Sequence, residues 1–126
     1  MLQAEGLVKS YGNLTILKSV SLHIQAGEIV SIVGSSGAGK TTLLSLLGTL
    51  AKPDSGTIAF EGTVLNTLNN RKLAAFRNLN LGFIFQFYQL LPEFTALENV
   101  MMPALIAGIS KSEAQKKAKA LLQELG

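Results

Sequence analysis

The chain of 126 residues has no cysteine and no tryptophan, and its formal net charge at pH 7 is only +3. Without cysteine it can form neither a disulfide framework nor a thiolate metal site, which fits a reducing compartment such as the cytosol. The lysines nearest the C-terminus have no arginine or aromatic residues among them, so they indicate a solvated helix face rather than a nucleic-acid surface. These lysines are Lys111, Lys116, Lys117 and Lys119.

Long apolar runs are also absent, and the start of the sequence does not predict a secretory leader. The longest apolar candidate, residues 99–109, is too short to cross a bilayer and contains Pro103 and Gly108. The first five residues lack the basic and apolar regions of a secretory signal. With 48% hydrophobic and 15% charged residues, the composition is that of one globular domain. We therefore expect any role at a membrane to depend on a partner.

The most informative feature present is a complete G-x-x-x-x-G-K-[ST] motif over residues 34–41. Glycine at 34, 37 and 39 lets successive backbone N–H groups point into one concavity that receives phosphate oxygens. We expect Lys40 to reach the β- and γ-phosphates and the Thr41 hydroxyl to bind Mg²⁺. The predicted nucleotide-binding residues of this loop are Gly34, Ser35, Ser36, Gly37, Ala38, Gly39, Lys40, Thr41 and Thr42.

The segments on either side of the motif favour a working phosphate loop over a chance Gly/Ser-rich turn. The β-branched run Glu28–Val33 predicts a strand buried on both faces. The run Thr42–Leu47 has straight-chain residues that favour a helix, whose N-terminal dipole would attract phosphate. Strand, loop and helix together predict binding of a nucleoside triphosphate.

The sequence has no acidic residue placed to hold the metal ion and the attacking water. Hydrolysis at such a site needs an acidic residue at the end of a second apolar strand. The only aspartate, Asp54, lies in a Pro-Asp-Ser-Gly sequence with the composition of a β-turn. None of the glutamates follows a run of four apolar residues: Glu5, Glu28, Glu61, Glu93, Glu98, Glu113 and Glu124.

Further elements follow from turn residues and periodicity. Besides the strand before the phosphate loop, we expect short strands at 2–10, 20–24, 57–60 and 63–65, the last two as an antiparallel ribbon, and a buried strand at 81–85 that ends at Gln86. A short helix is predicted at 70–77. Capping boxes at Thr95 and Ser110 open two more helices, the first of which should end or kink at Pro103. The second carries an apolar stripe that we interpret as core: Ala114, Ala118, Leu121, Leu122 and Leu125.

In order and spacing, several segments together resemble the ATP-binding subunits of ABC transporters. The segments that carry the resemblance are Tyr11, residues 17–28, the phosphate loop, residues 53–58 and Gln86. Residues 81–87 and 90–100, with Pro103, most resemble the ATPase of the lipoprotein-releasing system or the related macrolide-exporter type. The resemblance implies an α/β fold of the P-loop NTPase type, with a core sheet, an antiparallel β subdomain and the start of a helical subdomain.

The resemblance also implies roles for single residues, with ATP and Mg²⁺ as ligands. Tyr11 matches the aromatic residue that stacks on adenine, although a tyrosine at a strand end can simply cover core. Gln86 matches the glutamine that contacts Mg²⁺ or the water near the γ-phosphate, although it can also cap the sheet. Six apolar residues match the region where the family forms a groove for a helix of the membrane subunit, but they are equally compatible with a hydrophobic core. They are Phe87, Tyr88, Leu90, Leu91, Phe94 and Met101. We interpret His23 as structural.

The family's signature segment, acidic strand motif, D-loop and switch histidine do not occur in the sequence. We expect residues 1–126 to be the N-terminal portion of a single nucleotide-binding domain that binds ATP weakly and does not hydrolyse it. In the intact protein the resemblance implies membrane permease subunits, a second copy in a head-to-tail dimer, no nucleic acid, and a peripheral place on the cytoplasmic face of the inner membrane. The alternatives are a soluble ABC-type protein acting on nucleic acid or ribosomes and a non-catalytic nucleotide-binding module.

Overall fold

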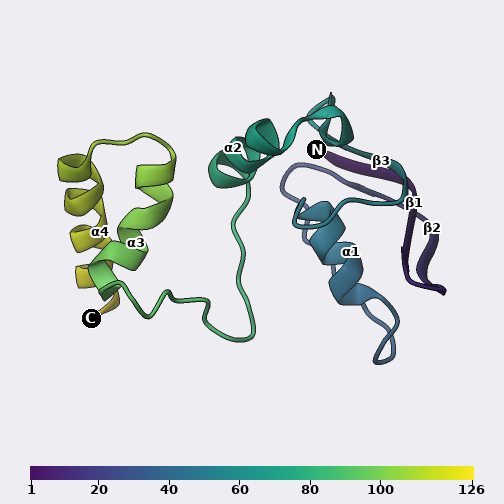
Figure 1. The fold of residues 1–126 in the computed structure, drawn as a ribbon, viewed down its shortest axis with the longest axis horizontal. Coiled ribbons are helices and arrows are strands. Elements are labelled where there is room, and N and C mark those ends of the chain that lie inside the picture. Colours follow the sequence, from purple (N-terminus) through teal and green to yellow (C-terminus); the bar gives the residue numbers. More distant parts are fainter. The chain divides into compact units, whose positions relative to one another are not determined.

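A computed structural model describes all residues from 1 to 126. The chain forms two compact units, Met1–Leu73 and Ala74–Gly126 (Figure 1). None of the helices combines the length and the apolar character needed to cross a membrane.

The first unit is built on a four-stranded antiparallel sheet in the order β2-β1-β3-β4. Strand β1 (Leu2–Tyr11) pairs with β2 (Leu14–Ile24) on one side and with β3 (Ser55–Phe60) on the other. The short strand β4 (Thr63–Val64) extends the sheet beyond β3. The antiparallel ribbon predicted for residues 57–60 and 63–65 is confirmed by the pairing of β3 with β4, and β1 matches the strand predicted at 2–10. The strand predicted at 20–24 is only the last part of β2, which begins at Leu14.

Helix α1 (Lys40–Leu47) packs on this sheet and buries Leu43, Leu46 and Leu47 (Figure 1). A 3₁₀ turn, η1 (Leu65–Thr67), and helix α2 (Asn70–Asn80) follow, and they bury Leu65 and Leu73. Each fully buried leucine stabilises the unit by about 2 kcal/mol. The apolar core of the unit consists of Ala4, Leu7, Leu17, Leu43, Leu46, Leu47, Ile58, Leu65 and Leu73.

The strand predicted at Glu28–Val33 is wrong. These residues form no strand and join no sheet, and the side chains of Ile29 and Val33 are 96% and 86% exposed. A strand of the buried type needs a neighbour on each side to satisfy its backbone groups. The antiparallel sheet is formed by other segments, so the β-branched composition of this run finds no partner.

The second unit contains α3 (Ala96–Ile106) and α4 (Lys111–Leu125). The predicted capping box of α3 is confirmed, because Thr95 accepts from the N–H of Glu98 and the Glu98 carboxylate accepts from the N–H of Thr95. Pro103 does not end the helix, which continues to Ile106. Proline removes one intrahelical hydrogen bond and crowds the carbonyl four residues earlier, and α3 tolerates both effects. The core between the helices is formed by Met101, Ala114 and Ala118, with Leu97, Val100, Ala104 and Ile109 around it.

Two expectations for α4 need correction. Ser110 accepts from the N–H of Glu113, but the reciprocal half of the capping box does not form, because the Glu113 carboxylate pairs with Lys117 Nζ at 3.0 Å instead. Only the first part of the apolar stripe is core, since Leu121 and Leu125 are exposed. The short partner helix α3 leaves the C-terminal turns of α4 without a covering surface.

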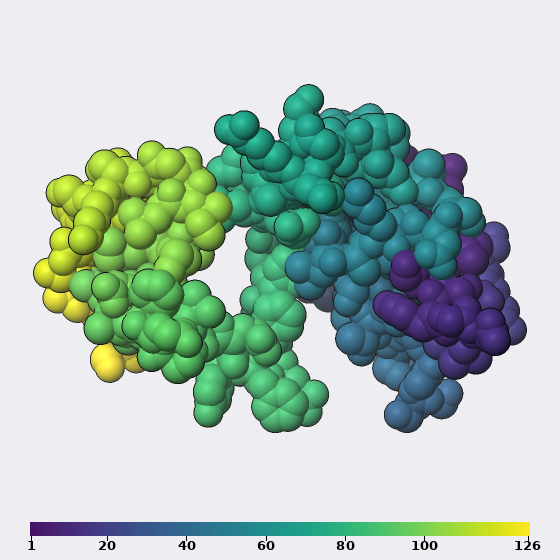
Figure 2. Space-filling view, viewed as in Figure 1, coloured from purple at the N-terminus to yellow at the C-terminus, as the bar shows by residue number.

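The buried strand predicted at 81–85 is also wrong. Residues 81–85 have no regular secondary structure, and Ile84 is fully exposed. The rings of Phe83 and Phe85 stack at 5.7 Å between centroids, as side chains two residues apart do on extended backbone. In Figure 2 the green part of the chain that includes this run is a narrow column of atoms rather than part of a packed layer. The run lacks a paired neighbour, so its apolar composition alone does not make a strand.

Candidate nucleotide-binding site

The phosphate loop leads directly into α1, as its motif predicts. Gly39 is the N-cap residue of α1 and has φ +86°, in the left-handed region. A Cβ atom at this position would lie 2.8 Å from Ile16 Cγ2 and 3.0 Å from Leu17 Cδ2, on strand β2. Glycine is therefore required twice, by the backbone conformation and by the close approach to β2.

Lys40 folds back onto the loop that precedes it. Its Nζ donates to the carbonyl oxygens of Gly34 and Ser35, at 2.9 and 2.7 Å. The loop thus wraps around the ammonium group, with a further turn closed by the Ala38 N–H on the Ser35 carbonyl. A phosphate group that enters the loop meets a cation already held at its centre, which is the electrostatic arrangement that the motif predicts.

A cavity of about 200 Å³ lies beside the loop and brings together residues that are distant in the sequence. Tyr11, at the end of β1, faces the same space as the loop and the first turn of α1. The residues that line the cavity are Tyr11, Ile16, Gly37, Gly39, Thr41 and Thr42. The predicted aromatic residue and four predicted loop residues therefore share one cavity, as a nucleotide with its base on Tyr11 and its phosphates in the loop requires.

Two charged residues next to Tyr11 were not predicted as part of the site. Lys9 Nζ lies 5.6 Å from the centroid of the Tyr11 ring and forms an ion pair with Asp54 Oδ1 at 2.8 Å. Asp54 Oδ2 also accepts from the backbone N–H of Ser10 at 2.7 Å. The hydrogen bond from Lys9 and then that from Ser10 hold the pKa of Asp54 below its usual value. The period of two along a strand, which puts positions 9 and 11 on one face, was the available signal.

The other predicted site residues are less organised. Ser35 and Ser36 are exposed in the loop, and the Thr41 side chain is exposed at the start of α1. An exposed hydroxyl suits Mg²⁺, which keeps several water ligands and takes few from the protein. Gln86 belongs to the second unit and is exposed on irregular backbone, so the prediction that it ends a strand is wrong.

The six residues predicted to form either a partner groove or core differ in their exposure in the structure. Phe87, Tyr88, Leu90, Leu91 and Phe94 are exposed, which excludes the core alternative for them in residues 1–126. Met101 is 3% exposed and lies in the core between α3 and α4, so the groove alternative does not apply to it. His23 is exposed on β2, opposite Gln3 of β1.

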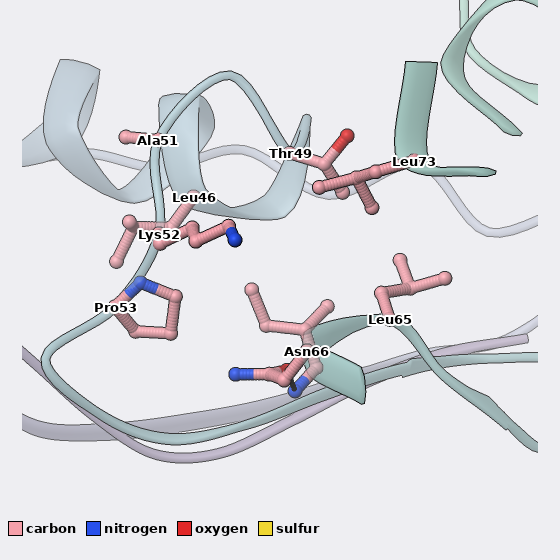
Figure 3. A pocket seen from close by; sticks show the side chains of 9 residues that line it. Leu46, Thr49, Ala51, Lys52, Pro53, Leu65, Asn66 and Leu73 are labelled. Atoms are coloured by element: carbon pink, nitrogen blue, oxygen red, sulfur yellow. Dashed lines mark hydrogen bonds between the residues drawn. The ribbon is translucent and has the colours of Figure 1, made fainter. Parts of the chain in front are cut away.

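A second cavity, of about 130 Å³, lies between the end of α1, strand β3, η1 and the start of α2 (Figure 3). Leu46, Leu65 and Leu73 gather around it. Asn66, its only amide side chain, is bonded to the backbone of β3 through Ile58 N–H and Gly56 O. None of the phosphate-loop residues lines this cavity, so it is separate from the loop and from Tyr11.

Comparison with known proteins identifies the family of the chain. The sequence model of the family described as "ABC transporter" matches residues 17–126. The chain is 59% identical to the lipoprotein-releasing system ATP-binding protein LolD of Bacteroides thetaiotaomicron, over all of this chain and 58% of that protein. It is 60% identical to LolD of Porphyromonas gingivalis, over 99% of this chain and 57% of that protein. The chain thus spans a little over half the length of these relatives.

A solved structure resembles the fold. It is the dimeric, post-hydrolysis state of the ATP-binding cassette MJ0796 bound to ADP and Pi, with a TM-score of 0.87 and 37% sequence identity. The match covers 98% of this chain and 56% of that one. The α/β fold of an ABC ATPase cassette is therefore confirmed for residues 1–126, although two of its expected strands are not formed.

Proposed function

Because the chain belongs to the ABC transporter family, we propose that its phosphate loop and Tyr11 bind ATP. The observation that carries this proposal is the shared cavity, in which Tyr11 and the loop residues Gly37, Gly39, Thr41 and Thr42 meet. Lys40 supplies the positive charge for the β- and γ-phosphates. Tyr11 supplies a flat aromatic face for the adenine ring.

Mg²⁺ fits the same site as the companion of the triphosphate. Thr41 offers it one hydroxyl ligand, and the phosphate oxygens and water supply the others. Bound there, the ion neutralises charge between the phosphates. We assign Gln86 a contact with the metal ion or with the water near the γ-phosphate, on the resemblance alone. Replacing Gln86 with alanine in the full-length gene product should lower ATP hydrolysis while ATP binding is kept.

At the level of the whole protein, we propose an ATP-binding subunit that couples ATP hydrolysis to lipoprotein release or export. The names of the LolD relatives support this proposal. The dimer of the similar cassette supports a pair of copies, which the resemblance implies to be head-to-tail. Membrane permease subunits would then be the partners, and the protein would lie peripherally on the cytoplasmic face of the inner membrane.

The binding proposal is tested by replacing Lys40 with alanine. A charge-assisted hydrogen bond contributes about 1.5 to 3 kcal/mol, and no neighbouring lysine lines the cavity, so ATP binding should become unmeasurable by calorimetry. The matched control is Lys18→Ala, which removes the same charge from an exposed position on β2. Unchanged ATP affinity in Lys40→Ala would disprove the assignment of the phosphate loop.

The transport proposal is tested by identifying what the full-length gene product binds in cells. Affinity purification from detergent-solubilised membranes should recover an integral membrane permease. Recovery of RNA or ribosomes in its place would favour the alternative of a soluble ABC-type protein. Recovery of neither, with ATP binding intact, would favour a non-catalytic nucleotide-binding module.

A further inference from the structure

We propose that the Lys9–Asp54 ion pair positions Tyr11 for the nucleotide base and links that position to the phosphate-loop helix. The inference rests on the proposed adenine contact of Tyr11. It assigns positioning roles to two residues that do not line the cavity themselves.

Asp54 bonds to three consecutive residues that precede Tyr11, to the backbone of Val8 and Ser10 and to the side chain of Lys9. Its N–H donates to the Val8 carbonyl at 2.9 Å. One carboxylate oxygen accepts from Lys9 Nζ at 2.8 Å, and the other accepts from the Ser10 N–H at 2.7 Å. Hydrogen bonds to a charged group are stronger than those between neutral groups, so this is a firm attachment for an exposed strand end.

The sheet itself provides little support at this point. The pairing of β1 with β3 ends at Val8 and Ser55, and the pairing with β2 changes register between Lys9 and Ser10. The Asp54 carboxylate therefore takes the place of a neighbouring strand for Ser10. Without it, the last residues of β1 would be held on one side only, by the bonds to β2.

Lys9 extends the attachment to the Tyr11 ring. Its ammonium lies 5.6 Å from the ring centroid, within the range of a cation–π contact. Its side chain is only 17% exposed, whereas Tyr11 is 55% exposed. Because Lys9 does not line the cavity, it restrains the ring while the cavity stays open to a base.

The position of Asp54 in the chain couples the two halves of the site. After α1 the chain turns through bonds from Leu50 and Ala51 to the Ser45 carbonyl, and it reaches Asp54 directly before β3. The base-binding ring and the helix that begins at the phosphate loop are therefore tied through one connection. This tie fixes the distance between the base contact and the phosphate contact, so less order has to be created when ATP binds.

The test compares ATP with tripolyphosphate, which has no base, by calorimetry on the full-length gene product. Lys9→Met and Asp54→Asn should each weaken ATP binding by about two- to ten-fold and leave tripolyphosphate binding unchanged, since the cost is the ordering of one aromatic side chain. Lys9→Arg keeps the cation and the ion pair, so it should bind ATP as the unchanged protein does. Lys18→Met removes one charge from β2 as the matched control.

A spectroscopic readout reports on Tyr11 without any ligand. Residues 1–126 contain no tryptophan and two tyrosines, so Tyr88→Phe leaves Tyr11 as the only tyrosine of this part of the protein. In that background the near-UV circular dichroism of a restrained ring should fall in Lys9→Met and Asp54→Asn. It should persist in Lys9→Arg and Lys18→Met, with far-UV spectra unchanged in all of them.

The outcomes separate this inference from the proposed function. If Tyr11→Ala leaves ATP affinity unchanged, the proposed base contact fails, and the dichroism alone decides the positioning role. If Tyr11→Ala weakens ATP binding while Lys9→Met and Asp54→Asn keep both affinity and dichroism, the positioning inference is overturned. It is also overturned if Lys9→Met weakens tripolyphosphate binding equally, or weakens ATP binding as much in the Tyr11→Ala background.

Discussion

At the scale of single residues, the Lys40 side chain organises the phosphate loop. The ammonium of Lys40 donates to two carbonyl oxygens of the loop. Phosphate oxygens that enter must share or replace these bonds, and the exchange is favourable because an anionic acceptor binds an ammonium more strongly than a carbonyl does. The same lysine therefore organises the loop, and we expect it to contribute charge to a complex with ATP.

Thr41 provides a test of the metal contact that is separate from the phosphate contact. Thr41→Ala should lower the ATP affinity measured with Mg²⁺ and leave the affinity measured in EDTA nearly unchanged, because only the metal ligand is lost. Thr41→Ser keeps the hydroxyl and should retain the Mg²⁺ effect. Calorimetry in the two buffers gives both affinities. An equal loss with and without Mg²⁺ would assign Thr41 to the phosphates instead.

At the level of elements, the sheet of the first unit depends on one close approach between β3 and β1. A Cβ atom on Gly56 would lie 2.5 Å from the Gly6 carbonyl oxygen and 2.6 Å from that of Glu5. Gly56 also has φ +92°. Gly56→Ala should cost about 3 kcal/mol or more, since backbone strain and overpacking add.

A variant of Gly62, in the turn between β3 and β4, separates the effect of backbone strain from the effect of overpacking. Its φ is +80°, but a Cβ atom there would meet nothing within 4 Å. Gly62→Ala should therefore cost only about 1 to 2 kcal/mol, the strain of the left-handed conformation alone. Urea unfolding followed by far-UV circular dichroism measures both variants. Equal losses would show that the close approach of the strands is not limiting.

The capping box of α3 makes the second unit sensitive to acid. Hydrogen bonds from the Thr95 N–H and then from the Thr95 hydroxyl hold the pKa of Glu98 below its usual value. A carboxyl whose pKa is lowered by folding contributes stability above its unfolded pKa and loses it as the pH falls through the folded pKa. The stability of this unit should therefore decrease as the pH falls below the ordinary pKa of a glutamate.

Glu98→Gln should reduce this acid dependence, because glutamine can complete a capping box without titrating. Glu113→Gln in α4 is the control, since Glu113 does not complete a capping box. Urea unfolding at several pH values measures the slope for each variant. If Glu98→Gln has the same slope as the unchanged chain, other carboxyl groups cause the acid sensitivity.

Local signals in the sequence predicted the elements that local contacts form. The helix after the phosphate loop, the capping box at Thr95 and the antiparallel ribbon of β3 and β4 depend on residues close in the chain, and these were predicted. The runs 28–33 and 81–85 were mistaken because a buried strand depends on partners elsewhere in the fold. Composition indicates that a segment can pair, but it does not supply the neighbour.

The sequence indicated the phosphate loop and Tyr11 as parts of the candidate site, but not the contacts that Asp54 makes beside Tyr11. The motif identified the loop, and the resemblance identified Tyr11, which the fold brings to the same cavity. Asp54 was interpreted only as a turn residue, because its sequence neighbours are Pro53 and Ser55. Its contacts are with residues 44 or more positions earlier, and no local pattern encodes them.

At the scale of the whole molecule, residues 1–126 leave much apolar surface uncovered. Ile29, Val33 and Ile84 are almost completely exposed, as are parts of the stretch from Phe83 to Phe94 and the end of α4. Exposed apolar groups in such number indicate surfaces that further chain or a partner covers in the assembled protein. A hydrophobic dye should therefore bind to residues 1–126 alone, and a relative of full length should bind less of it.

The last prediction concerns catalysis by residues 1–126 alone. The loop, Lys40 and Thr41 supply the groups that hold phosphates and metal. In the structure no group of three or more His, Cys, Asp or Glu side chains comes together to hold a metal ion. Without an acidic residue to orient the attacking water, only half of a transition-state site forms. We therefore expect no Lys40-dependent ATP hydrolysis, even with Mg²⁺ and at high protein concentration.

Phosphate release from purified residues 1–126, compared with the Lys40→Ala variant, measures this activity. The comparison removes background from contaminating ATPases, since these do not depend on Lys40. Activity that is lost with Lys40 would contradict the prediction and identify a catalytic acid among the glutamates of this chain. Glu61→Gln and Glu93→Gln would then be the first variants to assay, because both glutamates are exposed and lie outside the helices and strands.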